Sequence, residues 1–368
     1  MQASTAWLMM VMTVSMHVVH DVVTAVSALQ VSPLPAPWGQ ARIDYTFAQE
    51  HIDSRHPHLY HYFGKNKRGI VVEDIFNARD GVYVIEEDAK AEPTLENCGF
   101  ELHVLKKSHR GDEQPAAVSL IDWESPDQMR AFTEDLRRSV IPKSFGGGDD
   151  DILYCIFWNA FIRAPEMKSR SSSASLLNSG NDNESDVHVL PRLPPAPTAH
   201  IDVDVSELMD DSERLINLLE KNRVVNRAEF DSVKCDMMEL VREGHRFVML
   251  NIWRSLGEIP IQRDPLGLLA VRYGSLSTAY PMEELNERHS CWYFYPNMTC
   301  DECLLFKQYD RDATLSSDIW HCALSFLNEN VKGQSPVLPP RRSIDVRAFV
   351  VLKGKVDSKH DRFQSRNA

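Results

Sequence analysis

The second half of the chain alternates short runs of aromatic, aliphatic and β-branched residues with turns. After residue 245 these runs read RFVMLNIWRSL, LLAVRYGS, CWYFYP, CLLFKQYD, IWHCALSF and SIDVRAFVVLK. Strand-forming runs this short and this closely spaced are typical of β-sandwiches and jelly-roll barrels. The sequence therefore predicts a mainly β fold.

The remaining segments predict flanking helices and one long strand. Ser125 precedes PDQMRAFTEDLRRSVI, where apolar residues recur at helical spacing, and a serine in this position can cap a helix. The amphipathic stretches 205–222 and 228–243 predict two more helices, each covering a core with one face. ILYCIFWNAFIR, residues 152–163, is continuously apolar and predicts a fully buried strand.

Composition divides the chain at a segment that is poor in apolar residues. Residues 166–199 contain KSRSSSASLLNSGNDNESD and then LPRLPPAPTA, which bury too little apolar surface to offset the entropy lost on ordering. We interpret this segment as an insertion loop. The expected organisation is a poorly ordered or appended segment 1–40, an N-terminal part of the domain 41–165, the insertion loop 166–199, a jelly-roll catalytic core 200–355 and a tail 356–368.

The charge balance limits the expected partners. The chain carries 40 basic and 53 acidic residues, a formal net charge of −13, and so lacks the electrostatic footprint of a nucleic-acid-binding protein. The apolar run WLMMVMTVS is soon interrupted by His17, His20 and Asp21, so it is too short to span a bilayer. A signal peptide would require a basic residue near its start, but no Lys or Arg precedes Arg42. With seven cysteines spread along the chain, we expect a cytoplasmic protein without stable membrane insertion.

The sharpest chemical signal is His200-Ile201-Asp202. On a β-strand, residues i and i+2 project from the same face, so the imidazole and the carboxylate would converge on one point. Two histidines and one carboxylate form the facial site that holds Fe(II) and leaves positions open for a co-substrate and oxygen. The third ligand has to come from a distant strand, and His321 and His289 are the candidates.

A segment near the C-terminus supplies the cation that 2-oxoglutarate would need as a co-substrate. A guanidinium binds a carboxylate through two parallel hydrogen bonds, so an arginine suits the distal carboxylate of this molecule. In PPRRSIDVRAFVVLK, Arg341 and Ser343 lie two residues apart, and Arg347 follows on the same expected strand. The order of HxD pair, distal histidine and Arg/Ser is the order that an Fe(II)/2-oxoglutarate oxygenase requires.

Two other interpretations stay open from the residues alone. His289, Cys291, Cys300 and Cys303 offer groups that suit zinc, although they contain only one CxxC half-site. A catalytically silent jelly-roll would serve as a binding protein, although the complete set of HxD, histidine and arginine argues against the loss of activity.

Several motifs taken together resemble a known family. They are YCIFWNAFIR, AHIDVD, VMLNIWRSLGEIPIQRDPLGLLAV, CWYFYPNMTCDECLLFKQYD, WHCAL and RRSIDVRAFVV. In this series the chain resembles the fungal AsaB-type hydroxylase/desaturase family, which includes a gibberellin desaturase and is similar to CmcJ-like proteins. The resemblance implies a double-stranded β-helix, that is, a jelly-roll, cupin-like core. It also implies Fe(II), 2-oxoglutarate and O2 as cofactors.

The resemblance also implies roles for single residues. His200 and Asp202 fall on the HxD pair and His321 on the distal histidine, while Arg341 and Arg347 fall on the two arginines of the last motif. The implied reaction is hydroxylation or desaturation of an unactivated C–H bond in a small natural product. A wall of the substrate pocket is expected from residues of the N-x-W-R run and one later aromatic, namely Asn251, Trp253, Arg254 and Trp292.

Overall fold

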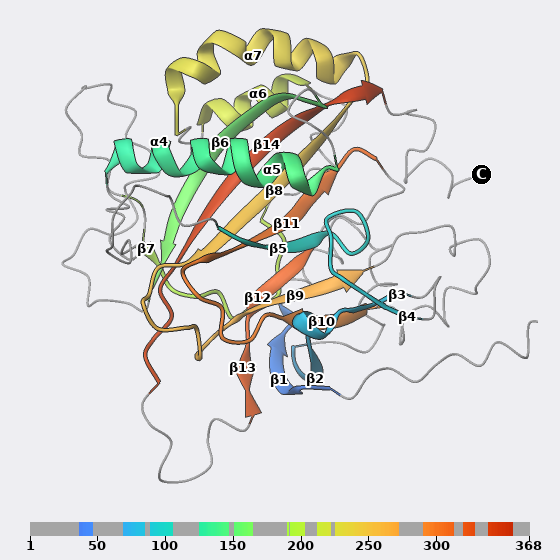
Figure 1. The fold of residues 1–368 in the computed structure, drawn as a ribbon, viewed down its shortest axis with the longest axis vertical. Helices are drawn as coiled ribbons and strands as arrows, with labels where there is room; N and C mark the ends of the chain where they lie inside the picture. The colour runs from blue at the N-terminus through green and yellow to red at the C-terminus, as the bar shows by residue number, and fades with distance from the viewer. Residues whose placement is uncertain are drawn as a thin grey trace, which may run out of the picture.

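A computed structural model describes residues 37–46, 69–84, 89–105, 125–146, 151–164, 190, 192–202, 212–221, 225–271, 290–312, 319–327 and 338–355. Within these ranges, two six-stranded sheets form the body of the protein, and helices cover the larger one (Figure 1). The expected tail 356–368 lies outside the described residues, as do most of the expected segments 1–40 and 166–199.

The larger sheet has the strand order β5-β11-β8-β14-β6-β7. Its neighbouring strands are antiparallel, apart from the parallel pair β6 and β7. The central strand β14 is buried along its first ten residues because strands flank it on both sides and side chains cover both faces. In sheet order the strands are β5 (Phe100–Val104), β11 (Glu302–Asp310), β8 (His245–Ser255), β14 (Ser343–Lys355), β6 (Ile152–Arg163) and β7 (Arg192–Leu193).

The smaller sheet has the order β12-β9-β10-β2-β1-β13. A separate hairpin pairs β3 (Val82–Val84) with β4 (Ala89–Ala91). Each sheet contains strands from both halves of the chain, so neither half has a sheet of its own. The strands of the smaller sheet are β12 (Trp320–Ala323), β9 (Leu266–Val271), β10 (Ser290–Phe294), β2 (Ile70–Asn77), β1 (Gly39–Asp44) and β13 (Ser325–Phe326).

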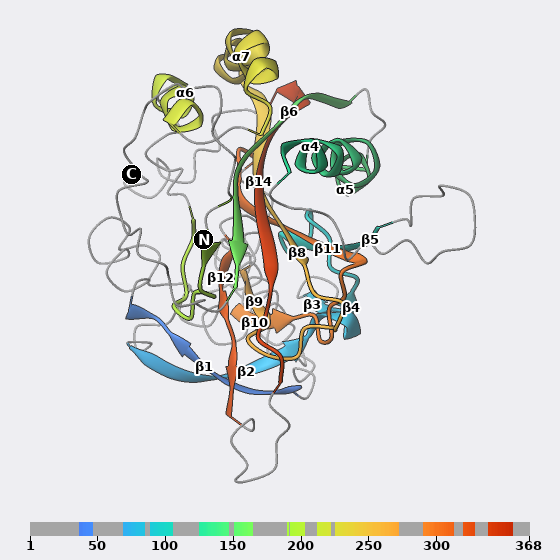
Figure 2. The same cartoon turned by 90° about the vertical axis from the view of Figure 1, so that its left-hand side faces the viewer.

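Helices cover the two faces of the larger sheet at different places (Figure 2). α4 (Pro126–Asp135) continues through a π-helical turn (Leu136–Val140) into α5 (Ile141–Ser144), and these helices pack on one face against side chains such as Leu250 and Ile344. α6 (Ser212–Lys221) and α7 (Arg227–Arg242) pack on the other face, against Met249 and Phe349. Met249 is one residue from Leu250, and Phe349 is five residues from Ile344. Residues an odd number of positions apart on a strand point to opposite faces. Ser125 and Asn226 cap the N-termini of α4 and α7. Ser125 Oγ accepts from the Gln128 N–H, and Asn226 Oδ1 accepts from the Glu229 N–H.

A third apolar cluster fills the space between the two sheets. Trp253 and Phe306 enter it from the larger sheet, and Leu268 and Tyr293 enter it from the smaller one. Trp253, Leu266 and Phe306 of this cluster also line a small pocket with polar side chains, and there the candidate site lies.

The fold prediction is confirmed: the protein is mainly β, with flanking helices, and two sheets form a jelly-roll core. The apolar run 152–163 is β6, and the helix predicted over 228–243 is α7. The helix predicted over 205–222 is described from Ser212, because residues 203–211 lie outside the described ranges. No helix in the described residues is long and apolar enough to cross a membrane.

Candidate metal centre

His200 and His321 are neighbours through their backbones. They form an antiparallel bridge in which each N–H donates to the other residue's carbonyl, at N–O distances of 3.1 and 3.0 Å. His321 lies on β12, and its own strand pairing with Leu268 fixes it in the smaller sheet. The expected regular strand over His200-Ile201-Asp202 is reduced to this single bridge, and the chain bends at Asp202. The two i, i+2 side chains nevertheless converge.

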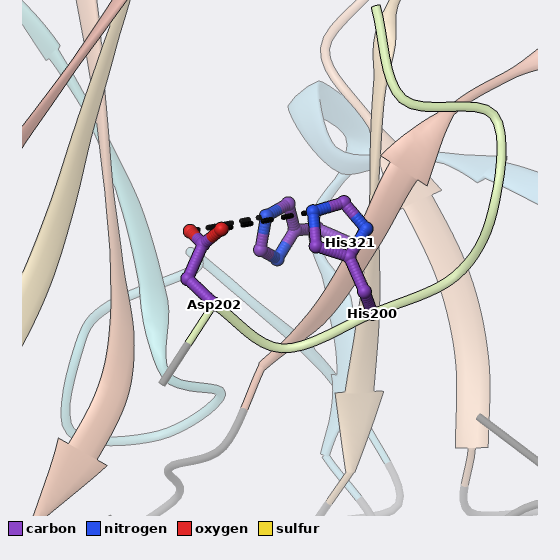
Figure 3. A group of neighbouring side chains, drawn as sticks. All are labelled: His200, Asp202 and His321. Carbon is purple, nitrogen blue, oxygen red and sulfur yellow. Dashed lines mark ion pairs between the residues drawn. The ribbon is translucent and has the colours of Figure 1, made fainter. Parts of the chain in front are cut away.

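The three side chains point at one another (Figure 3). Nε2 of His200 lies 3.7 Å from Asp202 Oδ1, and Nε2 of His321 lies 3.5 Å from Asp202 Oδ2. One ligand atom from each residue lies within 4.8 Å of the others, and in the described part of the chain this is the only group of His, Cys, Asp and Glu with metal-binding spacing. The structure thus brings together His200, Asp202 and His321, while His289 lies outside the described residues.

Backbone carbonyls fix the tautomers of both histidines. Nδ1 of His200 lies 2.7 Å from the Thr198 carbonyl oxygen, and Nδ1 of His321 lies 3.2 Å from the Ile319 carbonyl oxygen. A carbonyl can only accept, so each Nδ1 carries a proton, and in the neutral form of each ring Nε2 then keeps its lone pair. Burial, with a further contribution from His321, lowers the pKa of His200 to about 4. Both features suit metal ligation, which requires neutral imidazole.

The Asp202 carboxylate is held by other side chains. Arg347 NH2 lies 2.8 Å from Oδ1, and the Asn251 amide donates to Oδ2. Burial opposes ionisation of this carboxyl, but the Arg347 guanidinium outweighs burial and holds its pKa well below the usual value. Asp202 is therefore an anion with one oxygen facing each histidine.

A β-bulge in β6 positions two aromatic side chains against Arg347. Asp345 pairs with Phe161 but Arg347 pairs with Trp158, so β6 contains one extra residue, and there Asn159 adopts φ 53°. Trp158 and Phe161 thereby face the same way, and each ring centroid lies 5.4 Å from the Arg347 guanidinium carbon.

A small pocket opens beside the histidines, and Arg341 is its buried cation. NH1 of Arg341 donates to the Asp264 carbonyl at 2.6 Å, and its guanidinium carbon lies 5.5 Å from the Trp253 ring centroid. Nε of Arg341, Nε1 of Trp253 and Oδ1 of Asp345 are buried without a hydrogen-bond partner. Burial, and then Arg163, lower the pKa of Arg341 to about 10, so it stays charged at neutral pH. The pocket is lined by Arg163, Ala196, His200, Trp253, Leu266, Phe306, His321, Cys322, Ala323, Arg341 and Asp345.

The residues expected around the site have different locations. Trp253 lines the pocket, whereas Asn251 contacts Asp202. Arg254 points to the opposite face of the sheet, where it donates to the Cys300 carbonyl and lies over Phe132. Trp292 donates to the Tyr45 hydroxyl on the outer side of the smaller sheet. The structure does not bring Arg254 or Trp292 to the pocket.

Sequence reasoning overlooked three other polar residues around the site: Asp345, Arg163 and Gln308. Asp345 lies between Ser343 and Arg347 at strand spacing, so alternation alone could have placed it on their face. Arg163 ends β6 opposite Ser343, a pairing that only the sheet register reveals. Gln308 Oε1 accepts from the Asp202 N–H, and no local pattern signals that contact.

The cysteines expected for a zinc site are separated. Cys303 is buried in the core beneath α4, and Cys291 packs against the apolar cluster between the sheets. A larger hollow of about 320 Å³ beside α4 is lined by residues that include Arg137 and Glu229. These two form an ion pair at 2.6 Å, and this hollow lies away from the histidines. The chemistry therefore assigns the site to the smaller pocket.

Two facing sheets that hold two imidazoles and one carboxylate define a jelly-roll protein with a candidate metal centre. A family model described as an oxidoreductase/YMDC permease-like domain matches residues 219–351. Two curated fungal proteins are similar. Alpha-ketoglutarate-dependent dioxygenase phiK, from a fungal species, is 30% identical over 124 residues, which are 29% of this chain and 42% of phiK. Alpha-ketoglutarate-dependent dioxygenase tstK of Talaromyces stipitatus is 31% identical over 123 residues, 29% of this chain and 41% of tstK.

The chain thus spans about two fifths of the length of these curated relatives. The predicted resemblance is confirmed at the level of fungal alpha-ketoglutarate-dependent dioxygenases, alpha-ketoglutarate being 2-oxoglutarate. Two solved structures of the iron and alpha-ketoglutarate-dependent endoperoxidase NvfI align with TM-scores of 0.48 and 0.46. Their identities are 15% and 14%, and the alignments cover 88% of this chain and 99% and 100% of NvfI.

Proposed function

We propose that the chain is a non-haem Fe(II)/2-oxoglutarate-dependent oxygenase that hydroxylates or desaturates an unactivated C–H bond of a secondary metabolite. One observation carries this proposal: two Nε2 lone pairs and a carboxylate converge beside a pocket that contains a buried arginine. The fungal relatives named as dioxygenases support it.

The residues fit the metal that this function needs. Two imidazole nitrogens and one carboxylate oxygen are the donor set of Fe(II) oxygenases, and it leaves positions open on the metal. Both histidines already have Nδ1 bonded to a carbonyl, as ligating histidines usually do. When bound, Fe(II), 2-oxoglutarate and O2 together supply the oxidising power for C–H cleavage. The protein orients the ligands and excludes water from the buried centre.

Arg341 is the residue that we assign to the distal carboxylate of 2-oxoglutarate. It lines the same pocket as both histidines and has a buried Nε without a partner, which a carboxylate oxygen would satisfy. Arg347 is already paired with Asp202 and lies between two aromatic rings, so we assign it to that carboxylate instead. The Ser343 hydroxyl is also buried without a partner and is a second donor for the co-substrate.

The wider predictions belong to the same proposal. Trp253, Leu266 and Phe306 give the pocket an apolar wall, which supports a small natural product of apolar character as the substrate. We keep the boundaries 41–165 and 200–355 as two parts of one oxygenase domain, with 166–199 as an insertion. The acidic charge and the scattered cysteines support a cytoplasmic location.

Succinate formation tests the proposal. Wild-type protein with Fe(II), ascorbate, O2 and 2-oxoglutarate is expected to release succinate, because such enzymes turn over their co-substrate slowly even without the main substrate. His200→Ala should abolish release. His245→Ala is the matched control, since His245 bonds to the Leu352 carbonyl at the far end of β8. Equal succinate formation by wild type and His200→Ala would contradict the proposal.

A further inference from the structure

Gln308 is a buried side chain of β11, 1% exposed, that contacts two parts of the site. Its Oε1 accepts from the Asp202 N–H at 2.7 Å, and its Nε2 donates to the Ile319 carbonyl at 3.3 Å. An N–H can only donate and a carbonyl can only accept, so only this orientation of the carboxamide forms both bonds. The amide therefore connects the backbone of Asp202 to Ile319, the residue that directly precedes β12, the strand of His321.

The Ile319 carbonyl connects Gln308 to the candidate metal centre. The same oxygen accepts from Nδ1 of His321 at 3.2 Å and so sets the orientation of that imidazole. The Ile319 N–H donates to the carbonyl of Lys307, the residue before Gln308, at 3.0 Å. The segment before His321 is thus attached to β11 through its backbone and through the Gln308 side chain.

The backbones of the two histidines are joined to each other without such a side chain. His200 and His321 share two backbone hydrogen bonds, whereas the backbone of Asp202 is attached to β11 through the carboxamide of Gln308. A change at position 308 would therefore alter the position of Asp202 relative to His321 and leave the histidine pair in place.

We propose that Gln308 is a positioning residue that fixes the separation of Asp202 and His321 and so sets the affinity of the site for a divalent metal. This inference rests on the proposed function, since it assumes that the three residues hold a metal. Loss of a partner that orients metal ligands typically weakens metal binding by roughly 10- to 100-fold.

Co(II) is the probe that tests this role, because its visible d–d bands report affinity and geometry without turnover. The full chain is stripped with a chelator and titrated with Co(II) under nitrogen. Gln308→Met removes both hydrogen bonds at similar length, and Gln308→Asn keeps an amide that is too short to span them. Both variants are expected to bind Co(II) roughly 10- to 100-fold more weakly, with shifted bands.

Tyr45→Phe is the matched control for a general loss of stability. It removes a buried hydroxyl that accepts from Trp292 and donates to Glu73, neither of which lines the pocket. This variant should keep wild-type Co(II) affinity and bands. An equal loss in Tyr45→Phe would overturn the role of Gln308, because the effect would then be one of stability.

Folded Gln308 variants that bind Co(II) as the wild type does would also overturn the inference. If Gln308→Met does not fold, Gln308→Asn decides the matter. Asp202→Ala separates the two proposals: binding that is lost in Asp202→Ala but retained in both Gln308 variants contradicts only the positioning role. A wild-type protein that binds no Co(II) would overturn the metal site and the positioning role together.

Discussion

The two sides of the candidate metal centre are held in different ways. On the histidine side, two reciprocal backbone bonds join His200 to His321, and backbone carbonyls accept from both Nδ1 atoms. On the carboxylate side, Asp202 is held by three side chains from the larger sheet: Asn251, Arg347 and Gln308.

This difference follows from where the residues lie. His321 is part of β12 and His200 bridges to it, so the smaller sheet supplies their hydrogen bonds. Asp202 lies at a bend, two residues after the bridge at His200, where the backbone has no strand partner. Its buried polar groups therefore need hydrogen bonds from side chains. The histidine side should therefore tolerate changes of neighbouring side chains, and the carboxylate side should not.

Asp202→Ala is expected to have the largest effect on metal binding. It removes one of three ligands, so the loss of Co(II) affinity should exceed the ~100-fold seen for partners that only orient ligands. Titration with Co(II) measures this loss. Asp74→Ala, on the exposed face of β2, is the control and should bind as the wild type does. A loss smaller than that of Gln308→Met would contradict the assignment of Asp202 as a ligand.

Arg347→Met should destabilise the metal-free protein by about 3–5 kcal/mol, because it leaves the buried Asp202 anion without its ion-pair partner. Added Co(II) should recover part of this loss, since the metal binds the folded state and offsets the same charge. Denaturant unfolding with and without Co(II) provides the measurement.

Arg254→Met is the control for this experiment, because Arg254 is a buried arginine on the other face of the same sheet. The loss in the free energy of unfolding caused by Arg254→Met should be the same with and without Co(II). Equal recovery in both variants would show that Arg347 has no special relation to Asp202.

The histidine side predicts a pH dependence of the metal-free protein. Burial lowers the pKa of His200 from 6.5 to about 4, so between these values the unfolded chain binds a proton that the folded protein excludes. The contribution of His200 to the free energy of unfolding should be fully present above pH 6.5. It should fall, by about 3 kcal/mol at most, as the pH drops from 6.5 towards 4. Unfolding in chelator for wild type and His200→Asn measures the difference, and identical slopes would contradict it.

Thr198→Val should have the smallest effect. The structure uses the carbonyl of Thr198 to orient His200, and valine keeps that carbonyl. Metal affinity should change by less than about twofold, as for substitutions that alter no buried feature. A tenfold loss in the Co(II) titration would show that the histidine side also depends on side chains.

Most of the fold could be predicted from local patterns. The apolar run 152–163 became β6 with the predicted bounds, and the predicted helix after Ser125 begins with the predicted cap. These features were readable because burial on both faces and helix capping each leave a local signature in sequence.

The candidate site could be predicted only in part. Chemistry and order pointed to His200 and Asp202, and they made His321 and Arg341 candidates beside His289 and Arg347. The structure groups His200, Asp202 and His321, and it places Arg341 in the pocket beside the two histidines. The contacts of Gln308 and Arg163 depend on register between strands far apart in the chain, and the bulge at Asn159 that seats Arg347 has no sequence signal of its own. Such long-range pairing is decided by tertiary packing, which local patterns do not encode.

Anaerobic titration of the purified protein with Fe(II) and 2-oxoglutarate tests the central claim most directly. An Fe(II) centre that binds this 2-oxo acid through two oxygens gives a weak visible charge-transfer band. We expect the band in wild type, its loss in His200→Ala, and a weaker apparent affinity for 2-oxoglutarate in Arg341→Ala. A folded wild-type protein that takes up iron but shows no band with 2-oxoglutarate would contradict the oxygenase assignment and would favour a catalytically silent relative.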